Sequence, residues 1–299
     1  MSLFIGVDAG GSRTTAVVAD GTGPELARAE QGAGNVRPGN AQVAAEVIAA
    51  ACRDALQRAR RQAPARTMVV GAAGAGREPE RLALEGALAD KGLADTVHVT
   101  TDAAIALEAA FDDQPGVVLI AGTGSIAWAR LPDGTLVRAG GLGPLLGDHG
   151  SGFDLGFSAL RAVGLSIHGL GPATTLVDRL LARLGVSGDD LPRWAQTARP
   201  AEVAALAPDV LDAAAEGDAV ARRIAEAGAD FLARHGRLLC GRFPPGARVP
   251  VAFGGGVLVN RSDYRAMTAG RLRLLAPSAA PVKDPVDGAA GAIRLARRM

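Results

Sequence analysis

The sequence predicts an α/β protein made of two duplicated lobes around a central cleft. Three observations predict this fold. A strand–turn–strand–strand pattern followed by helix and strand starts at residue 3 and again at residue 116. Each copy has a glycine turn between its first two strands. The chain has 299 residues, 48% of them hydrophobic, which is enough for a large core.

We expect each lobe to follow the order βββαβαβα. The N-terminal lobe is expected over 1–113, the C-terminal lobe over 114–285, and a last helix over about 286–299 is expected to pack back on the first lobe. In the first lobe, apolar runs and helical spacing predict the elements. The strands are expected over 3–7, 14–19, 25–31, 67–71 and 96–100, and the helices over 41–61, 78–91 and 103–111.

The second lobe is expected to begin with strands over 116–121, 126–131 and 135–139, and helices dominate 151–242. A further strand is expected over 249–253 and a final helix over 287–298. The intervening segment 140–152 is too rich in glycine to be a helix. Its residues Leu142, Leu145 and Leu146 predict a packed loop rather than a flexible linker.

Composition argues against several classes of protein. Lys and Arg number 32 against 31 Asp and Glu, so the net charge of +1 gives no basic character for binding nucleic acid or an anionic membrane. No stretch of about 20 residues is apolar enough to span a bilayer. Cys52 and Cys240 lie far apart and provide no disulfide framework or CxxC pair. We therefore expect a cytoplasmic protein with no nucleic acid or membrane partner.

Three glycine turns follow apolar strands, at Asp8–Ser12, Gly122–Ser125 and Gly254–Gly256. Each turn alone is typical of a tight hairpin. Backbone N–H groups in such turns can instead form an anion-binding concavity, and three of them favour a cradle for nucleotide phosphates. A Walker A loop is excluded because neither lysine, Lys91 or Lys283, follows a glycine and precedes Ser or Thr.

Three other kinds of site are also disfavoured: a dinucleotide-binding site, a histidine metal site and the active site of a serine hydrolase. The segment 122–127 matches the loose dinucleotide pattern GxGxxA, but the residues after it alternate like a hairpin instead of opening a helix. The histidines have no spacing for metal ligands. Ser125 and Ser151 lie near glycines but lack the GxSxG elbow of serine hydrolases.

Two strand-end carboxylates suit phosphoryl transfer, which needs a metal, backbone donors and a positioned base when no lysine cradle exists. Asp8 is placed to organise Mg²⁺ or the γ-phosphate region, although an aspartate there can also simply form the turn. Asp102 ends a buried strand before a helix, where it can act as a helix cap or accept a proton from a hydroxyl group.

These segments together resemble the sugar-kinase, actin and heat-shock ATPase fold, which is ribonuclease H-like. Within it the chain resembles the family of N-acetylglucosamine kinases and BadF/BadG-type ATPases. The resemblance covers nearly the whole chain, from residue 4 to about 293. The resemblance is carried by six motifs. Asp8–Thr14 and Gly122–Ser125 resemble the two phosphate motifs, and Gly254–Gly256 resembles the adenosine motif. Thr101–Ala103 resembles the catalytic motif, Gly141–Ser151 the sugar-side loop, and Gly34–Asn35 the segment with the sugar-contact asparagine.

The resemblance implies ATP-dependent phosphorylation of an amino sugar at its 6-hydroxyl, with N-acetylglucosamine as the first candidate and Mg²⁺ as cofactor. Asp102 is then the catalytic base and Asp8 the metal residue. The residues implied for ATP and its phosphates are Asp8, Gly10, Gly11, Ser12, Thr14, Gly122, Thr123, Gly124, Ser125, Gly254, Gly255 and Gly256. Those implied for the sugar are Asn35, Gly74, Asp102, Gly141, Leu142 and Asp148.

Three departures from the family pattern bear on the substrate. Leu142 replaces the usual Trp and His149 the usual Glu, which changes the sugar side, and Ala9 replaces a glycine. Glucosamine or N-acetylmuramate is therefore also open as the substrate. An ATPase that activates or regulates another protein without sugar kinase activity is the alternative function, and a silent sugar-binding protein is a third. A homodimer is the base-rate expectation.

Overall fold

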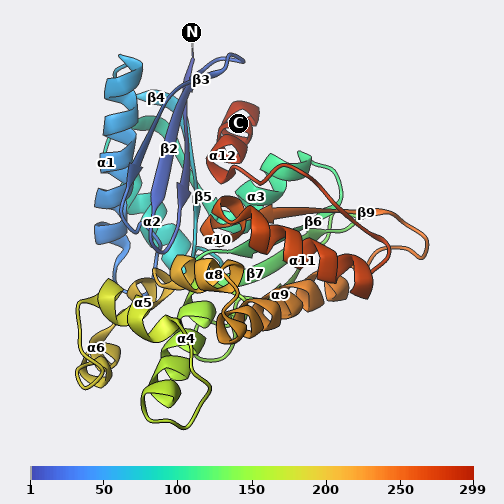
Figure 1. Ribbon diagram of the computed structural model, residues 1–299. Helices are drawn as coiled ribbons and strands as arrows, with labels where there is room; N and C mark the ends of the chain where they lie inside the picture. The colour runs from blue at the N-terminus through green and yellow to red at the C-terminus, as the bar shows by residue number, and fades with distance from the viewer. Residues whose placement is uncertain (1) are drawn as a thin grey trace. The chain divides into compact units, whose positions relative to one another are not determined.

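The computed structural model describes residues 2–299 (Figure 1). The chain folds into two compact units. The first unit runs to Gln114 and also contains Val286–Met299, and the second unit is Pro115–Pro285. Each unit contains one five-stranded sheet with its own helices.

The sheet of the first unit has the order β3-β2-β1-β4-β5. The first three strands form an antiparallel meander, and β4 and β5 extend it in parallel. Their apolar side chains alternate between the two faces, as the strand period of two requires. The strands are β1 (Leu3–Ala9), β2 (Thr14–Asp20), β3 (Glu25–Gln31), β4 (Ala65–Ala72) and β5 (Ala94–Thr101).

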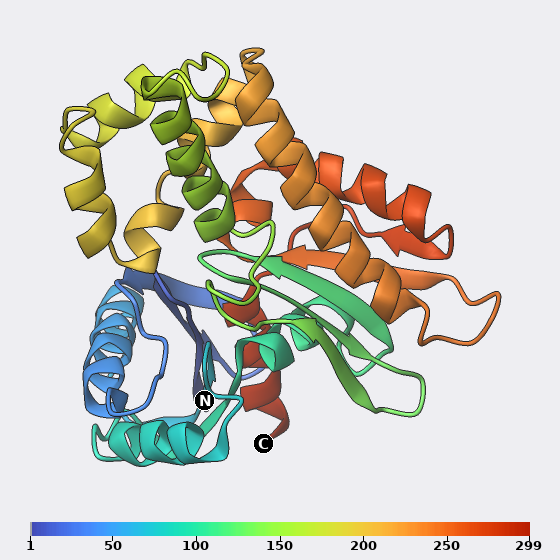
Figure 2. The same cartoon turned by 90° about the horizontal axis from the view of Figure 1, so that it is seen from below.

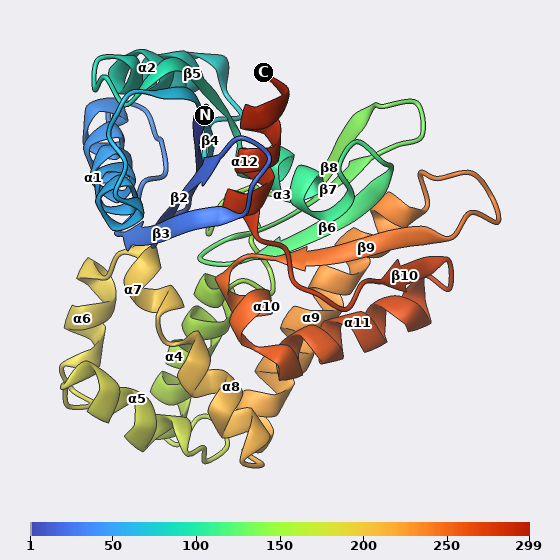
Figure 3. The same ribbon diagram turned by 90° about the horizontal axis from the view of Figure 1, so that it is seen from above.

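Helices cover both faces of this sheet (Figure 3). On one face, α1 (Ala41–Ala59) and α2 (Glu78–Ala89) pack on a core that includes Ile5 and Val18. On the other face, α12 (Gly288–Arg298) packs on β1 and on α3 (Asp102–Phe111). The last helix of the chain therefore belongs to the first unit, where it covers Phe4 and Val17.

The sheet of the second unit has the order β10-β9-β6-β7-β8, which is the order of the first sheet with each strand replaced by its counterpart. The predicted duplication is thus present in the topology of the two sheets. The short β10 had no counterpart in the sequence-based expectation. The strands are β6 (Gly116–Ala121), β7 (Ser125–Arg130), β8 (Leu136–Gly140), β9 (Val249–Gly254) and β10 (Ala279–Pro281).

Two long helices, α9 (Ala219–Cys240) and α11 (Ser262–Leu275), pack along one face of this sheet with Phe253 and Leu119 in the core (Figure 2). Five further helices form a second apolar cluster beside them. They are α4 (Gly152–Ile167), α5 (Leu176–Leu184), α6 (Leu191–Thr197), α7 (Pro200–Ala204) and α8 (Ala207–Ala215). The short α10 (Gly256–Asn260) follows β9 and packs in the core of the sheet through Leu258.

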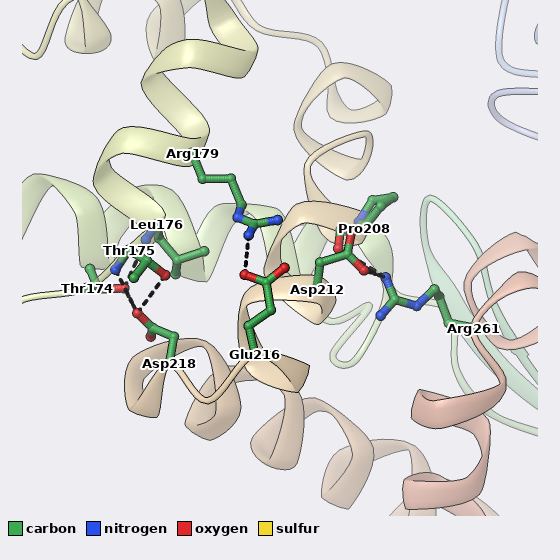
Figure 4. Close-up of polar contacts among 9 residues, drawn as sticks. All are labelled: Thr174, Thr175, Leu176, Arg179, Pro208, Asp212, Glu216, Asp218 and Arg261. Atoms are coloured by element: carbon green, nitrogen blue, oxygen red, sulfur yellow. Dashed lines mark hydrogen bonds and ion pairs between the residues drawn. The ribbon is translucent and has the colours of Figure 1, made fainter.

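Asp218 ties this helical region to α9 (Figure 4). One carboxylate oxygen accepts hydrogen bonds from the N–H groups of Val220 and Ala221 and so caps α9, and the other accepts from Thr174 and Thr175. Burial alone would raise the pKa of Asp218, but these hydrogen bonds lower it to about 2. Figure 4 also shows Arg261 between Asp212 and the carbonyl oxygen of Pro208.

The expectation that the leucines of segment 140–152 pack is wrong. Leu142, Leu145 and Leu146 are 60%, 92% and 78% exposed. The loop is held instead by its glycines and by backbone hydrogen bonds, such as that from Gly147 N–H to the carbonyl of Gly143.

Asp8, which was expected in a turn, lies inside β1. Cys52 and Cys240 are free and buried. None of the helices within 2–299 is long and apolar enough to cross a membrane.

Candidate functional site

In the first unit, the carboxylate of Asp8 lies against the first turn of α12. A Cβ atom built on Gly288 would be 2.6 Å from Asp8 Oδ2, so only glycine fits at that position without displacing the carboxylate. The helix is brought this close by Gly6, where a Cβ atom would be 2.6 Å from the backbone nitrogen of Ile293. The sequence therefore places two glycines where β1 and α12 touch.

The environment of Asp8 is acidic. Burial, followed by the negative charges of Asp102 and Asp287, raises the pKa of Asp8 to about 7, while Arg13 opposes the shift. The three carboxylates come from β1, α3 and the N-cap of α12. Sequence reasoning missed Asp287, whose only signal was an Asp-Gly pair at the start of the last predicted helix.

Asp102 is the first residue of α3 and is not its cap. Thr101 takes the capping role, since its Oγ1 accepts a hydrogen bond from the N–H of Ala104 at 3.1 Å. Asp102 Oδ1 accepts from the N–H of Ala103 at 2.9 Å. Burial raises the pKa of Asp102, and its hydrogen bonds to the backbone, led by that from Ala103, only partly oppose that shift. A carboxylate with a raised pKa is a stronger proton acceptor.

The residues implied for the sugar in the first unit are linked to the first glycine turn. The N–H groups of Gly34 and Asn35 both donate to the carbonyl oxygen of Gly10. Gly74 has a φ of 91°, and a Cβ atom there would be 2.0 Å from the carbonyl oxygen of Val36. The backbone therefore holds Asn35 and Gly74 beside the β1–β2 turn.

Within that turn, Gly11 and Ser12 lie at the tip, between β1 and β2. The N–H of Gly10 donates to the carbonyl oxygen of Arg13 at 2.8 Å and closes the turn. Thr14 is fully buried, and its hydroxyl donates to the carbonyl oxygen of Gly32. The side chain of Thr14 thus braces the turn, whereas Gly11 and Ser12 are accessible.

In the second unit, two of the predicted glycine turns meet. A Cβ atom on Gly122 would be 3.6 Å from the backbone nitrogen of Gly256, and one on Gly255 would be 2.5 Å from the carbonyl oxygen of Ala121. The start of α4 joins them, because the N–H groups of Gly152 and Phe153 donate to the carbonyls of Gly122 and Thr123. The β6–β7 turn, the end of β9 and the start of α4 form one cluster.

The sugar-side loop reaches the same cluster through Asp148. A Cβ atom on Gly124 would be 2.6 Å from Asp148 Oδ2, so the carboxylate lies directly on the glycine turn. Burial raises the pKa of Asp148, and hydrogen bonds from the backbone of Ser125 and Gly143 oppose the shift. The N–H of Gly141 donates to the carbonyl oxygen of Ser125, which fixes the other end of the loop.

The two residues of this loop that differ from the family pattern, Leu142 and His149, have different surroundings. Leu142 is exposed and contacts Gly147, where a Cβ atom would lie 3.0 Å from Leu142 Cβ. The ring of His149 stacks on Phe231 of α9 with centroids 4.4 Å apart. Ser125 Oγ donates to the carbonyl oxygen of His149 at 2.8 Å, so the loop is tied to the β6–β7 turn at this point too.

No group of three His, Cys, Asp or Glu side chains in residues 2–299 is arranged to hold a metal ion by itself. Mg²⁺ in phosphoryl-transfer enzymes is bound through one or two carboxylates together with phosphate oxygens and water. The donors around Asp8 are hard carboxylate oxygens that repel one another, so they fit a Mg²⁺ ion that arrives with phosphates.

The duplicated sheets, with glycine turns at their strand ends, have the fold of actin- and hexokinase-type ATPases. The chain belongs to the BadF/BadG/BcrA/BcrD ATPase family, whose model matches residues 5–296. This agrees with the family that the sequence motifs indicated. Asp287 and Arg13, which the motifs did not assign to the site, act electrostatically on Asp8.

Two curated relatives are sugar kinases. The chain is 30% identical over 236 residues to an N-acetyl-D-glucosamine kinase of Dictyostelium discoideum, covering 74% of each chain. It is 29% identical over 228 residues to an N-acetylmuramic acid/N-acetylglucosamine kinase of Clostridium acetobutylicum, covering 75% of this chain and 74% of that one. A candidate N-acetylglucosamine kinase structure from Chromobacterium violaceum superposes with a TM-score of 0.79 at 27% identity over 99% of each chain.

Proposed function

We propose that the protein is an ATP-dependent kinase that phosphorylates an amino sugar, with N-acetylglucosamine as the first candidate and its 6-hydroxyl as the acceptor. The observation that carries the proposal is the placement of Asp102, a carboxylate with a raised pKa at the start of α3, in the electrostatic surroundings of Asp8. The sugar kinase relatives support the same class of substrate.

The reaction forms a bond between the oxygen of the sugar hydroxyl and the γ-phosphorus of ATP. The bond from that phosphorus to the bridging oxygen breaks, and ADP leaves with the electron pair. In our proposal the carboxylate of Asp102 accepts the proton of the attacking hydroxyl. Because Thr101 caps α3, the carboxylate of Asp102 is not needed to begin the helix.

The phosphates are assigned to backbone donors. In the first unit these are the N–H groups at Gly11 and Ser12. In the second unit they are those of Thr123, Gly124 and Ser125, because the N–H of Gly122 donates to the carbonyl oxygen of Gly124. Such groups bind anions because successive N–H groups of a turn converge. Gly254–Gly256 is assigned to the adenosine. Asp8 is assigned to Mg²⁺, which when bound neutralises charge on the phosphates.

The sugar is assigned to Asn35, Gly74 and Asp102 in the first unit and to Gly141, Leu142 and Asp148 in the second. Asn35 and Asp148 supply polar groups for hydroxyls. An exposed Leu142 and the stacked His149 leave the sugar side without the Trp and Glu expected for the family. We therefore extend the proposed substrates to glucosamine and N-acetylmuramate.

A homodimer is a further prediction, and sedimentation equilibrium measures the oligomeric state directly.

A coupled assay of ADP release tests the proposal. The substrates are N-acetylglucosamine, glucosamine, N-acetylmuramate and glucose, each with and without EDTA. We expect release to depend on one of the amino sugars and on Mg²⁺, and we expect phosphorus NMR to show a sugar 6-phosphate. ATP turnover that is indifferent to every sugar would support an activator or regulatory ATPase instead.

A further inference from the structure

The sugar-side loop, residues 140–152, meets the middle of α9 at a pair of glycines. Gly150 has a φ of 77°, and a Cβ atom there would overlap the carbonyl oxygen of Gly228 in α9. Glycine is a poor residue for the middle of a helix, so the choice at position 228 needs a reason. A Cβ atom on Gly228 would lie 3.1 Å from Gly150 Cα and 2.5 Å from the hydroxyl oxygen of Tyr264. At this point α9 is therefore thin enough for a side chain of α11 to reach the loop.

Tyr264, in the first turn of α11, is the side chain that reaches it. It is the single tyrosine of the chain, it is 1% exposed, and its hydroxyl donates to the carbonyl oxygen of Gly150 at 3.0 Å. Burial, followed by the negative charge of Asp154, raises the pKa of Tyr264, so the hydroxyl keeps its proton and remains a donor. The ring lies in the apolar core of the sheet, where a phenylalanine would pack as well. What the hydroxyl adds is the bond to the loop.

The N–H group of Gly150 is held as well, by a different helix. It donates to Asp154 Oδ2 at 2.8 Å, and Asp154 lies in the first turn of α4. The N–H of Asp154 donates in turn to Oγ of Ser151, the N-cap of that helix. Both polar groups of Gly150 are thus fixed, one by α4 and the other by α11. The end of the sugar-side loop is attached to two helices that lie far apart in the sequence.

This attachment bears on Asp148, which the proposed function assigns to the sugar. The N–H of Ser151 donates to the carbonyl oxygen of Asp148 at 3.1 Å and closes a turn over residues 148–151. Asp148 and Gly150 both have a positive φ in this turn, of 56° and 77°. For aspartate such a backbone conformation is strained, and it persists only where the surroundings fix it. The bond from Tyr264 is one of the contacts that fix this turn.

We propose that Tyr264 is a positioning residue of the sugar site: its hydrogen bond to Gly150 holds the turn 148–151 so that the carboxylate of Asp148 is oriented toward a sugar hydroxyl. The inference deepens the proposed function and rests on it. Tyr264 acts through Gly150 and takes no part in the chemical step. Without the hydroxyl the turn adopts further conformations, and only the fraction in the native one binds sugar. The apparent dissociation constant for sugar then rises by the inverse of that fraction.

The test compares Tyr264→Phe with the matched control Thr268→Val. Thr268 lies one turn further along α11 and is fully buried, and its hydroxyl donates to the carbonyl oxygen of Tyr264 within the helix. Each variant removes one buried hydroxyl from α11, but only that of Tyr264 touches the loop. The ADP-release assay measures KM and kcat. Calorimetry measures binding of N-acetylglucosamine and of a non-hydrolysable ATP analogue.

We expect the loss to fall on sugar binding alone. In Tyr264→Phe the KM and Kd for sugar should rise about tenfold, because a buried carbonyl oxygen loses its donor. Its kcat at saturating sugar and its Kd for the analogue should stay within about threefold of wild type. Thr268→Val should keep all these constants within about threefold, although its melting temperature falls. A sugar KM of Tyr264→Phe within twofold of wild type, or equal weakening of sugar and analogue binding, would overturn the inference.

Hydrogen exchange of residues 140–152, followed by mass spectrometry without substrates, separates the two proposals. We expect this segment to exchange about tenfold faster in Tyr264→Phe and at the wild-type rate in Thr268→Val, both well below their melting temperatures. Unchanged exchange in Tyr264→Phe would also overturn the inference. If the wild type phosphorylates no sugar, the proposed function is wrong, and the exchange rates alone decide whether Tyr264 fixes the loop. If the wild type phosphorylates an amino sugar and Tyr264→Phe has a normal KM, the proposed function stands and the role of Tyr264 is wrong.

Discussion

The carboxylate of Asp148 lies directly on Gly124, with Oδ2 only 2.6 Å from the position that a Cβ atom would take. The contact joins the sugar-side loop to the β6–β7 turn, which the proposal assigns to the phosphates. Asp148 is itself held in a left-handed backbone conformation, with a φ of 56°. A change on either side of this contact must therefore displace the other.

Gly124→Ala tests the contact. We expect the added methyl group to push Asp148 away and to lower kcat/KM for sugar by about 100-fold, because misplacement of a positioning group by about 1 Å is costly. The control is Gly164→Ala in α4, where a Cβ atom would meet nothing within 4 Å. Steady-state kinetics with a constant melting temperature check this prediction, and a variant as active as the control would contradict it.

Asp102→Asn tests the assigned base. The amide keeps the size of the side chain but cannot accept the proton, so we expect kcat to fall by roughly 100- to 10,000-fold, the contribution typical of general-base catalysis. Binding of ATP and sugar should change little. Asp95→Asn at an exposed position of β5, the strand before α3, is the control. Activity retained within a few-fold would remove Asp102 from the mechanism.

The pH dependence of folding tests the environment of Asp8. Its pKa in the folded protein is about 7 against 3.8 for the free group, so the folded state binds the proton more tightly than the unfolded state. The stability that this proton contributes is fully present below about pH 4 and is lost as the pH rises through about 7.

Urea unfolding of the nucleotide-free protein between pH 4 and pH 8 measures this effect. Asp8→Asn carries no ionisable group, so we expect its advantage in free energy of unfolding over wild type to grow with pH across that window. The control is Asp95→Asn, which should leave the wild-type slope in place. A pH slope in Asp8→Asn equal to that of wild type would show that another group is responsible.

Much of the fold followed from the sequence because its signals were local. Strands such as Gly116–Ala121 and Glu25–Gln31 were predicted with their observed bounds, since apolar runs ended by turn residues define them. The glycine turns were also found, because glycine after an apolar strand has few structural alternatives. The segment from Gly256 to Leu275 was left without an element, since α11 carries arginines on much of its surface.

The surroundings of Asp8 depend on contacts far apart in the chain, and these have no local signal. Asp287 reaches Asp8 only because Gly6 and Gly288 let α12 approach β1. Arg13 lies within the first phosphate motif of the sequence, but its contact with Glu30 depends on the register between β2 and β3. The exposure of Leu142 is a similar case, since apolar character predicts burial and tertiary context decides it.

Gly6→Ala tests whether the docking of α12 matters for both stability and nucleotide binding. The methyl group would lie 2.6 Å from the nitrogen of Ile293 and 2.7 Å from the carbonyl oxygen of Ala289, and backbone atoms cannot rotate away. We expect a loss of about 1–3 kcal/mol in the free energy of unfolding, the usual cost of overpacking. Gly32→Ala is the matched control, because a Cβ atom there meets nothing within 4 Å.

The same substitution should weaken binding of Mg²⁺ with ATP, because α12 begins at Gly288, beside the carboxylate of Asp8. We expect a several-fold rise in Kd for the non-hydrolysable analogue in the presence of Mg²⁺ and little change in its absence. Calorimetry with and without EDTA separates the two cases. A destabilised Gly6→Ala protein with unchanged Mg²⁺-dependent binding would show that α12 supports the fold of the first unit without positioning Asp8.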